Sequence, residues 1–166
     1  MVHIAHEEGL AVMSHTNGAK AVADAVEAGA DSIEHGNYVD EDTLKLMAQS
    51  SVVWVPTITV VKNLIGCGRF SDVVLNQIWE TGSQNIRRGY ELGVQMALGS
   101  DAGLIWCLMV RAFWMNWLAF RRFWERKKTF FFRLSEGEKL IREKFKKKVL
   151  TIWKTFAIIL FVVRQN

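Results

Sequence analysis

The chain has little of several things that define other classes of protein. Among its 166 residues there are one proline and two cysteines, and half of the residues are hydrophobic. This composition excludes an intrinsically disordered chain. Cys67 and Cys107 match no metal-binding spacing and no disulfide framework. The N-terminal "MVHIAHEEGLAV" lacks a basic segment followed by an apolar one, so we expect no secretory signal and a cytoplasmic location.

The second part of the chain contains no aspartate and only one of the twelve glycines. Residues 1–103 carry 6 Lys and Arg against 13 Asp and Glu, a net charge of −7. Residues 104–166 carry 15 Lys and Arg against 4 Glu, a net charge of +11, and hold five of the seven tryptophans. We therefore predict two regions, 1–103 and a basic, tryptophan-rich tail over 104–166.

The first region alternates short apolar runs with segments of helical spacing. The segments 9–15, 31–36, 52–60 and 94–101 predict strands, and 18–30, 40–50 and about 71–92 predict helices. Gly29 and Gly93 are placed to end two of these helices. Strands of near-continuous apolar character that alternate with helices predict an α/β fold of four parallel βα units.

Three of the predicted strands end in a residue that can bind a metal ion: His15, His35 and Asp101. In a parallel array the carboxyl ends of the strands gather on one face, and a (β/α)8 barrel builds its active site there. Imidazole nitrogens and a carboxylate suit Zn²⁺, Mn²⁺ or Fe²⁺. A histidine at a strand end can equally be structural, and spacing alone leaves both interpretations open.

The segment "AVMSHTNGAKAVADAVEAGADSIEHGNYVDEDTLKLMAQSSVVWVPTI", with "ALGSDAG" further on, resembles the amidohydrolase superfamily in its imidazolonepropionase and prolidase-like branch. The resemblance covers about residues 1–103 and implies a partial (β/α)8 TIM barrel, strands five to eight. It implies that His15 and His35 bind metal at the ends of strands five and six. Asp101 would be the aspartate of strand eight, which binds metal and acts as general acid and base.

The activity that this resemblance implies is hydrolysis of a C–N bond, in an amide, cyclic amide or dipeptide, by metal-activated water. The cofactor would be a divalent metal ion, with zinc as first choice. The family pattern also includes a His-x-His pair from strand one and a carboxylated lysine from strand four. His3 and His6 precede the first strand and do not fit that pair, so we expect surface positions for both and an inactive chain.

The tail has two apolar runs, 104–120 and 149–163. Both are shorter than the ~20 residues that a membrane-spanning helix needs. We expect the tail to be helical or poorly ordered. A membrane-surface or interaction role through its basic and aromatic residues is the alternative function, and no nucleic-acid motif is present.

A shifted reading frame offers another explanation of the tail. Tryptophan and methionine each have a single codon, so the nucleotides around them are known from the protein sequence. When these codons are read one nucleotide earlier, Trp106–Cys107 must give Val and Met109–Val110 must give Gly. The residues 113–117 must give Leu-Asp-Glu-Leu. These residues resemble the family's continuation after the strand-eight aspartate. The hypothesis is that 104–166 is a frameshifted translation and the chain a gene remnant.

The partners that we expect follow from these interpretations. The substrate is a small molecule, and there is no nucleic-acid partner. The first strand would present an unpaired edge, which favours self-association through the open barrel.

Overall fold

The computed structural model describes residues 1–99, 101 and 162–164. The elements are α1 (Val2–Glu7), β1 (Leu10–Thr16), α2 (Ala19–Glu27), β2 (Ser32–His35), α3 (Glu41–Gln49), β3 (Val53–Val55), α4 (Thr59–Leu64), α5 (Asp72–Leu92), β4 (Gln95–Met96) and β5 (Val162–Arg164). The predicted boundary near residue 103 and the tail apart from 162–164 lie outside the described residues.

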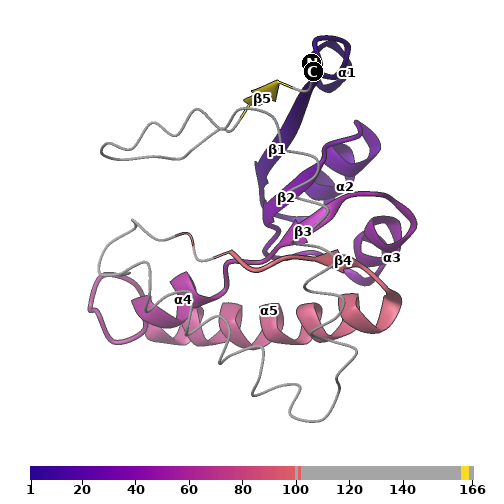
Figure 1. Ribbon diagram of the computed structural model, residues 1–166. Helices are drawn as coiled ribbons and strands as arrows, with labels where there is room; N and C mark the ends of the chain where they lie inside the picture. The colour runs from indigo at the N-terminus through magenta and orange to yellow at the C-terminus, as the bar shows by residue number, and fades with distance from the viewer. Residues whose placement is uncertain (100, 102–161, 165–166) are drawn as a thin grey trace.

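The strands form one sheet in the order β4-β3-β2-β1-β5, and β1 to β4 run parallel to their neighbours. Helices α2, α3 and α5 lie on one side of these four strands (Figure 1). One core cluster joins the helices to the sheet, through residues such as Val22 of α2, Met47 of α3, Ile86 of α5 and Trp54 of β3. The α/β prediction with four parallel strands is therefore confirmed.

Local sequence explains where two of the helices begin and end. The Asp40 carboxylate accepts a hydrogen bond from the Thr43 backbone N–H at 2.9 Å and so caps the start of α3. Helix α5 ends at Gly93, which adopts the left-handed conformation with φ of 94° that favours glycine. A Cβ added at Gly89 would lie 2.8 Å from Met96 Cε and 3.1 Å from Trp54 Cζ3, so this glycine lets α5 pack closely on the sheet.

Two predicted strands are shorter than their apolar runs. The run 52–60 forms a strand only over Val53–Val55, and Thr59–Leu64 is helix α4. Pro56 lies between them and has no backbone N–H to continue the hydrogen-bonding ladder. The run 94–101 forms a strand only over Gln95–Met96, so Asp101 lies several residues beyond the end of β4.

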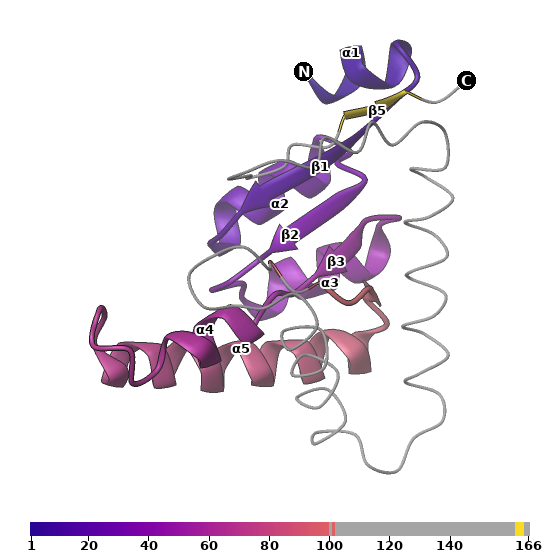
Figure 2. The ribbon, with the colours of Figure 1, turned by 60° about the vertical axis from the view of Figure 1, so that its left-hand side comes forward.

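The outer edge of β1 is partly covered. Strand β5 pairs with it antiparallel, with Leu10 opposite Arg164 and Val12 opposite Val162, and Figure 2 shows it beside β1 and close to α1. The prediction of an unpaired first edge is thus wrong for these three residues of β1. Residues 162–164 also form a strand where the sequence predicted a helical or poorly ordered tail.

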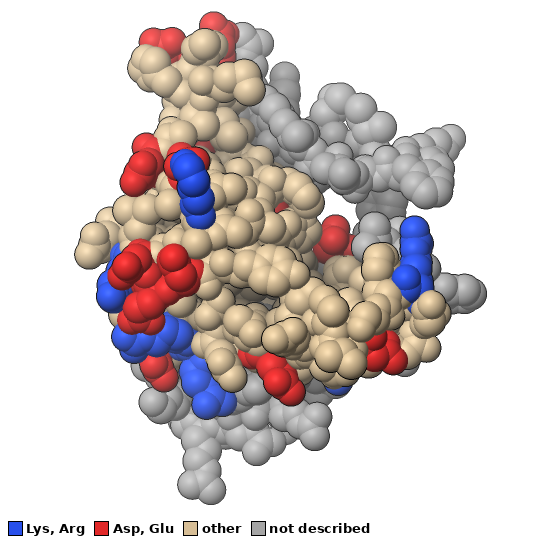
Figure 3. Space-filling model, turned by 180° about the vertical axis from the view of Figure 1, so that it is seen from behind, with Lys and Arg blue, Asp and Glu red and all other residues tan. Residues whose placement is uncertain are grey.

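Charges of both signs are interspersed on the surface seen in Figure 3. Arg88 Nη2 lies 2.6 Å from Glu41 Oε1 and links α5 to α3, and Lys20 Nζ lies 2.8 Å from Asp24 Oδ2 within α2. That face of the described part therefore presents mixed charge and no uniformly basic surface.

Candidate functional site

The parallel pairing of β1 with β2 brings two histidines together at the carboxyl ends of these strands. His35 is the last residue of β2 and lies opposite Thr16 in the register. Thr16 directly follows His15 in β1. The ring centroids of His15 and His35 are 4.5 Å apart, with an angle of 78° between the rings. The pairing predicted from the strand ends is therefore present for these two residues.

The loops that follow β1 and β2 are hydrogen-bonded to each other. Gly18 N–H donates to the Asn37 carbonyl at 2.7 Å, and Asn37 N–H donates to Asn17 Oδ1 at 2.9 Å. These two bonds join the backbone just after each histidine, so they fix the separation of the two strand ends.

The backbone at His35 adopts an uncommon conformation. Its φ is 67°, a value rare for residues other than glycine. The indole N–H of Trp54 donates to the His35 carbonyl oxygen at 2.9 Å, and the Thr57 hydroxyl lies 2.5 Å from His35 Nδ1. Gly36 follows with a φ of 62°, and a Cβ there would lie 2.6 Å from Trp54 Nε1. Glycine at position 36 is therefore a requirement of this turn, because the indole occupies the space of a side chain.

Asp101 is exposed, with a φ of 46°. Its negative charge acts on two neighbours at the strand ends. The negative charge of Asp101 acts to raise the pKa of His35, against the larger effect of burial, which lowers it. The same charge helps to raise the pKa of Glu34. Asp101 is thus electrostatically coupled to the His35 region, although it lies outside any strand.

Burial lowers the pKa of His35, and the neighbouring His15 lowers it further. The lowered pKa keeps the imidazole neutral at pH 7, and the neutral ring is the form that binds a metal ion.

Glu34 is the residue of this region that the sequence interpretation missed. Burial raises its pKa to about 7, Asp101 adds to the increase, and the hydrogen bond from the Ser32 hydroxyl at 2.7 Å opposes it. The signal was an acidic side chain inside a predicted strand, "DSIEHG", since a carboxyl group that a strand buries in the sheet is costly to keep in its charged form.

The two histidines are well placed to bind a metal ion together, but the described residues do not provide a complete set of ligands. The two rings lie side by side on adjacent strand ends, and imidazole nitrogens are suitable ligands for a divalent ion. Within the described part of the chain, however, no group of three His, Cys, Asp or Glu residues is placed to hold one ion. The predicted set of His15, His35 and Asp101 therefore stays a prediction.

The two histidines of α1 differ in their surroundings. His3 is exposed and lies 3.1 Å from Glu7 on the same helix, as expected for a surface residue. His6 Nε2 lies 2.9 Å from Asp31 Oδ2, and the same oxygen accepts from Val12 N–H at 2.8 Å. His6 is exposed, as the sequence predicted, and it also ties α1 to the start of β2.

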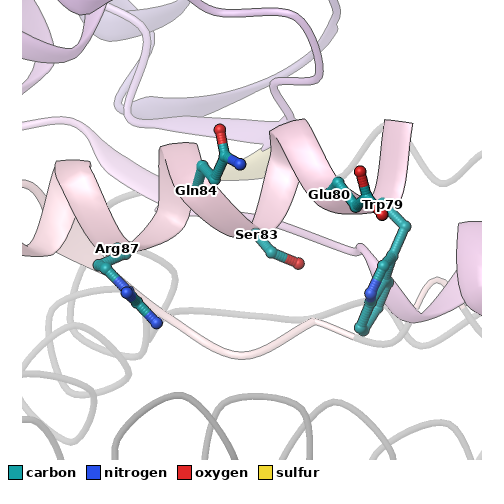
Figure 4. Close-up of a pocket in the computed structure, with 5 residues that line it drawn as sticks. All are labelled: Trp79, Glu80, Ser83, Gln84 and Arg87. Atoms are coloured by element: carbon teal, nitrogen blue, oxygen red, sulfur yellow. The ribbon is translucent and has the colours of Figure 1, made fainter. Parts of the chain in front are cut away.

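A pocket of about 310 Å³ lies on helix α5, and none of the predicted ligands lines it. Figure 4 shows Trp79, Ser83 and Arg87 pointing to one side of the helix, with Glu80 and Gln84 turned away. These five residues supply one wall from a single helix, so the strand ends remain the candidate site. Among the described residues, no helix is both long and apolar enough to cross a membrane.

Comparison with known proteins adds to this geometry. The model of the Amidohydrolase family matches residues 1–136. An uncharacterized protein of Mycobacterium tuberculosis is 30% identical over 108 residues, 61% of this chain and 29% of that protein. Ochratoxinase of Aspergillus niger is 26% identical over 106 residues, 61% of this chain and 22% of that enzyme. The chain thus spans less than a third of these relatives.

The fold is also similar to solved structures. A Xaa-Pro dipeptidase with bound methionine in its active site superposes with a TM-score of 0.65 at 29% identity, over 88% of this chain and 37% of that one. A prolidase complexed with N-methylphosphonate-L-proline superposes with a TM-score of 0.53 at 33% identity, over 60% of this chain and 26% of that one.

Proposed function

The chain belongs to the amidohydrolase family, and on that premise we propose that it is part of a metal-dependent hydrolase of C–N bonds. The observation that carries the proposal is the pair His15 and His35, with ring centroids 4.5 Å apart at the ends of two parallel strands. The relatives named as a Xaa-Pro dipeptidase and a prolidase favour an amide or dipeptide as the substrate class.

In this proposal His15 and His35 hold the ion through ring nitrogens, and Asp101 is the third ligand. Zinc is the metal of first choice, because two imidazoles and a carboxylate form a ligand set common in its sites. A bound divalent metal supplies a Lewis acid that acidifies water and polarises the carbonyl group.

Asp101 has the second role of general acid and base. Its carboxylate takes the proton of the attacking water and delivers it to the leaving nitrogen. The C–N bond breaks, the hydroxyl group stays on the carbonyl carbon, and the products are a carboxylic acid and an amine. The exposure of Asp101 suits a residue that must reach a substrate from solvent.

We further propose that this chain alone does not turn over substrate. It spans 22% to 29% of the curated relatives, and a (β/α)8 barrel has eight parallel strands where β1 to β4 are described here. The same reasoning supports self-association, because the described part of β5 pairs with Leu10–Val12 of β1, away from the His15 end of that strand. A molar mass that rises with protein concentration in light scattering would support association, and a constant monomer mass would contradict it.

Zinc binding by the full chain tests the proposal. The chain is stripped with a chelator, titrated with zinc and compared with His15→Ala, His35→Ala and the exposed control His3→Ala. Each of the first two substitutions removes a ligand, so we expect zinc affinity to fall by more than ~10-fold, the lower bound typical even for outer-shell changes. Equal affinities in all three variants, or no zinc binding by the parent chain, would refute the metal site.

A further inference from the structure

We infer that Thr57 is a positioning residue that holds the His35 ring with Nδ1 protonated and Nε2 left as the free nitrogen at the strand-end site. The inference rests on the function proposed above, because it assigns the ligand atom of that site. The contact joins the end of β2 to the segment that follows β3, and the sequence did not predict it.

A hydrogen bond joins the Thr57 hydroxyl to the ring of His35. Thr57 Oγ1 lies 2.5 Å from His35 Nδ1, and the Thr57 residue is only 8% exposed. An imidazole has two nitrogens, so the one that contacts the buried hydroxyl is not available to a metal ion. Nε2 is the remaining ligand atom.

The backbone carbonyl and the ring of His35 are both held by residues of the same neighbouring segment. Trp54 belongs to β3, and Thr57 follows that strand by two residues. Trp54 donates to the His35 carbonyl at 2.9 Å while Thr57 contacts the ring. With the backbone and the ring both fixed, the ring has one favoured orientation relative to His15.

The segment that leads to Asp101 passes beside Thr57. A Cβ added at Gly99 would lie 2.4 Å from Val55 Cγ1 and 3.3 Å from Thr57 Cγ2. The backbone two residues before Asp101 therefore passes close to the methyl group of Thr57. One side of the Thr57 side chain contacts His35 and the other lies beside the segment that carries the predicted third ligand.

The position of the proton follows from the chemistry of coordination. A metal ion needs the lone pair of Nε2, so the proton of the neutral ring must lie on Nδ1. Nδ1–H then donates, and Thr57 Oγ1 accepts. A hydroxyl group can accept in this way, and valine, which has almost the same shape, cannot.

Nitrogen NMR of the full chain labelled with ¹⁵N-histidine tests this assignment without any turnover. Spectra are recorded in chelator at about pH 8, above the ordinary imidazole pKa of ~6.5. The His35 signals are identified by their absence in His35→Gln. The variants are Thr57→Val, which removes the acceptor, Thr57→Ser, which keeps it, and Thr59→Val, a matched change at a nearby buried threonine.

We expect the parent chain, Thr57→Ser and Thr59→Val to show the two separate ¹⁵N shifts of a ring protonated on Nδ1. In Thr57→Val the two shifts should move toward each other as the tautomers mix. A parent ring protonated on Nε2, or a Thr57→Val spectrum identical to that of the parent, would overturn the inference. Circular dichroism of each variant confirms that the fold is retained.

Zinc added to the same samples separates this inference from the proposed function. If zinc moves the Nε2 signal of the parent chain, both are supported. If the tautomers behave as expected and zinc moves no histidine signal, the positioning role of Thr57 stands and the metal site fails.

Discussion

The buried carboxyl group of Glu34 predicts that the stability of the chain falls as the pH rises through the neutral range. Its pKa is about 7 in the folded chain against an ordinary value of 4.5, mainly because burial disfavours the charged form. Between these two pH values the folded chain keeps a proton that the unfolded chain releases. Since the folded state binds more protons, the free energy of unfolding decreases with rising pH over this window.

The size of the effect follows from the two pKa values. The difference between about 7 and 4.5 is about 2.5 units, and each unit corresponds to ~1.36 kcal/mol. The parent chain should therefore lose about 3 kcal/mol of stability between pH 4.5 and pH 8 through this one group. Glu34→Gln removes the titration and keeps a carbonyl oxygen for the Ser32 hydroxyl, so its stability should lack this loss.

Urea unfolding followed by tryptophan fluorescence, in chelator and at several pH values from 4.5 to 8, measures the difference between parent and variant. We expect the stability of Glu34→Gln relative to the parent to rise by about 3 kcal/mol across this range. Glu8→Gln, at an exposed position, controls for the loss of one negative charge. A difference between Glu34→Gln and the parent that stays constant with pH would refute the argument.

Three further substitutions test contacts within the described fold by urea unfolding. Gly36→Ala places a Cβ 2.6 Å from Trp54 Nε1 at a φ of 62°, so we expect a loss of roughly 1–3 kcal/mol, and unchanged stability would contradict the observed turn. Gly89→Ala crowds Met96 and Trp54, which should lower the free energy of unfolding by ~1–3 kcal/mol. We expect this loss to exceed the ~1 kcal/mol by which alanine favours the helix. A more stable variant would show that α5 can move away from the sheet. Asp31→Ala removes the acceptor of the Val12 N–H, which should cost about 1–3 kcal/mol, and a neutral change would mean that water replaces the carboxylate.

Much of the fold could be predicted because the pattern of apolar residues is local information. Strands β1 and β2 begin and end within one residue of the predicted runs, and α5 ends at the glycine that the sequence indicated. The third and fourth strands were overestimated, since the β-branched residues after Pro56 suit a strand and a buried helix equally well. Only tertiary contacts decide between the two, and here "TVVKNL" becomes α4 and packs against α5.

The site was predictable to the extent that it depends on strand ends. The strand pattern and the parallel arrangement were enough to place His15 beside His35. The contacts of Thr57 and Trp54 with His35 were not predictable. They depend on the side-chain orientation of Thr57 and on the left-handed backbone conformation of His35, and neither can be read from the residue types. The raised pKa of Glu34 likewise depends on burial within the folded chain, which the residue type alone does not give.

The position of β5 limits what the described strands bring to the predicted ligands His15 and His35. In a closed parallel barrel the outer edge of β1 would pair with another parallel strand, whose carboxyl end would reach the level of His15. Strand β5 runs antiparallel and pairs with Leu10–Val12, at the opposite end of β1 from His15. It therefore covers part of the edge without bringing a strand end to the site. Among the described residues Asp101 is the remaining predicted ligand, and in a closed barrel strands added beside β1 and beside β4 would bring further residues to the same face.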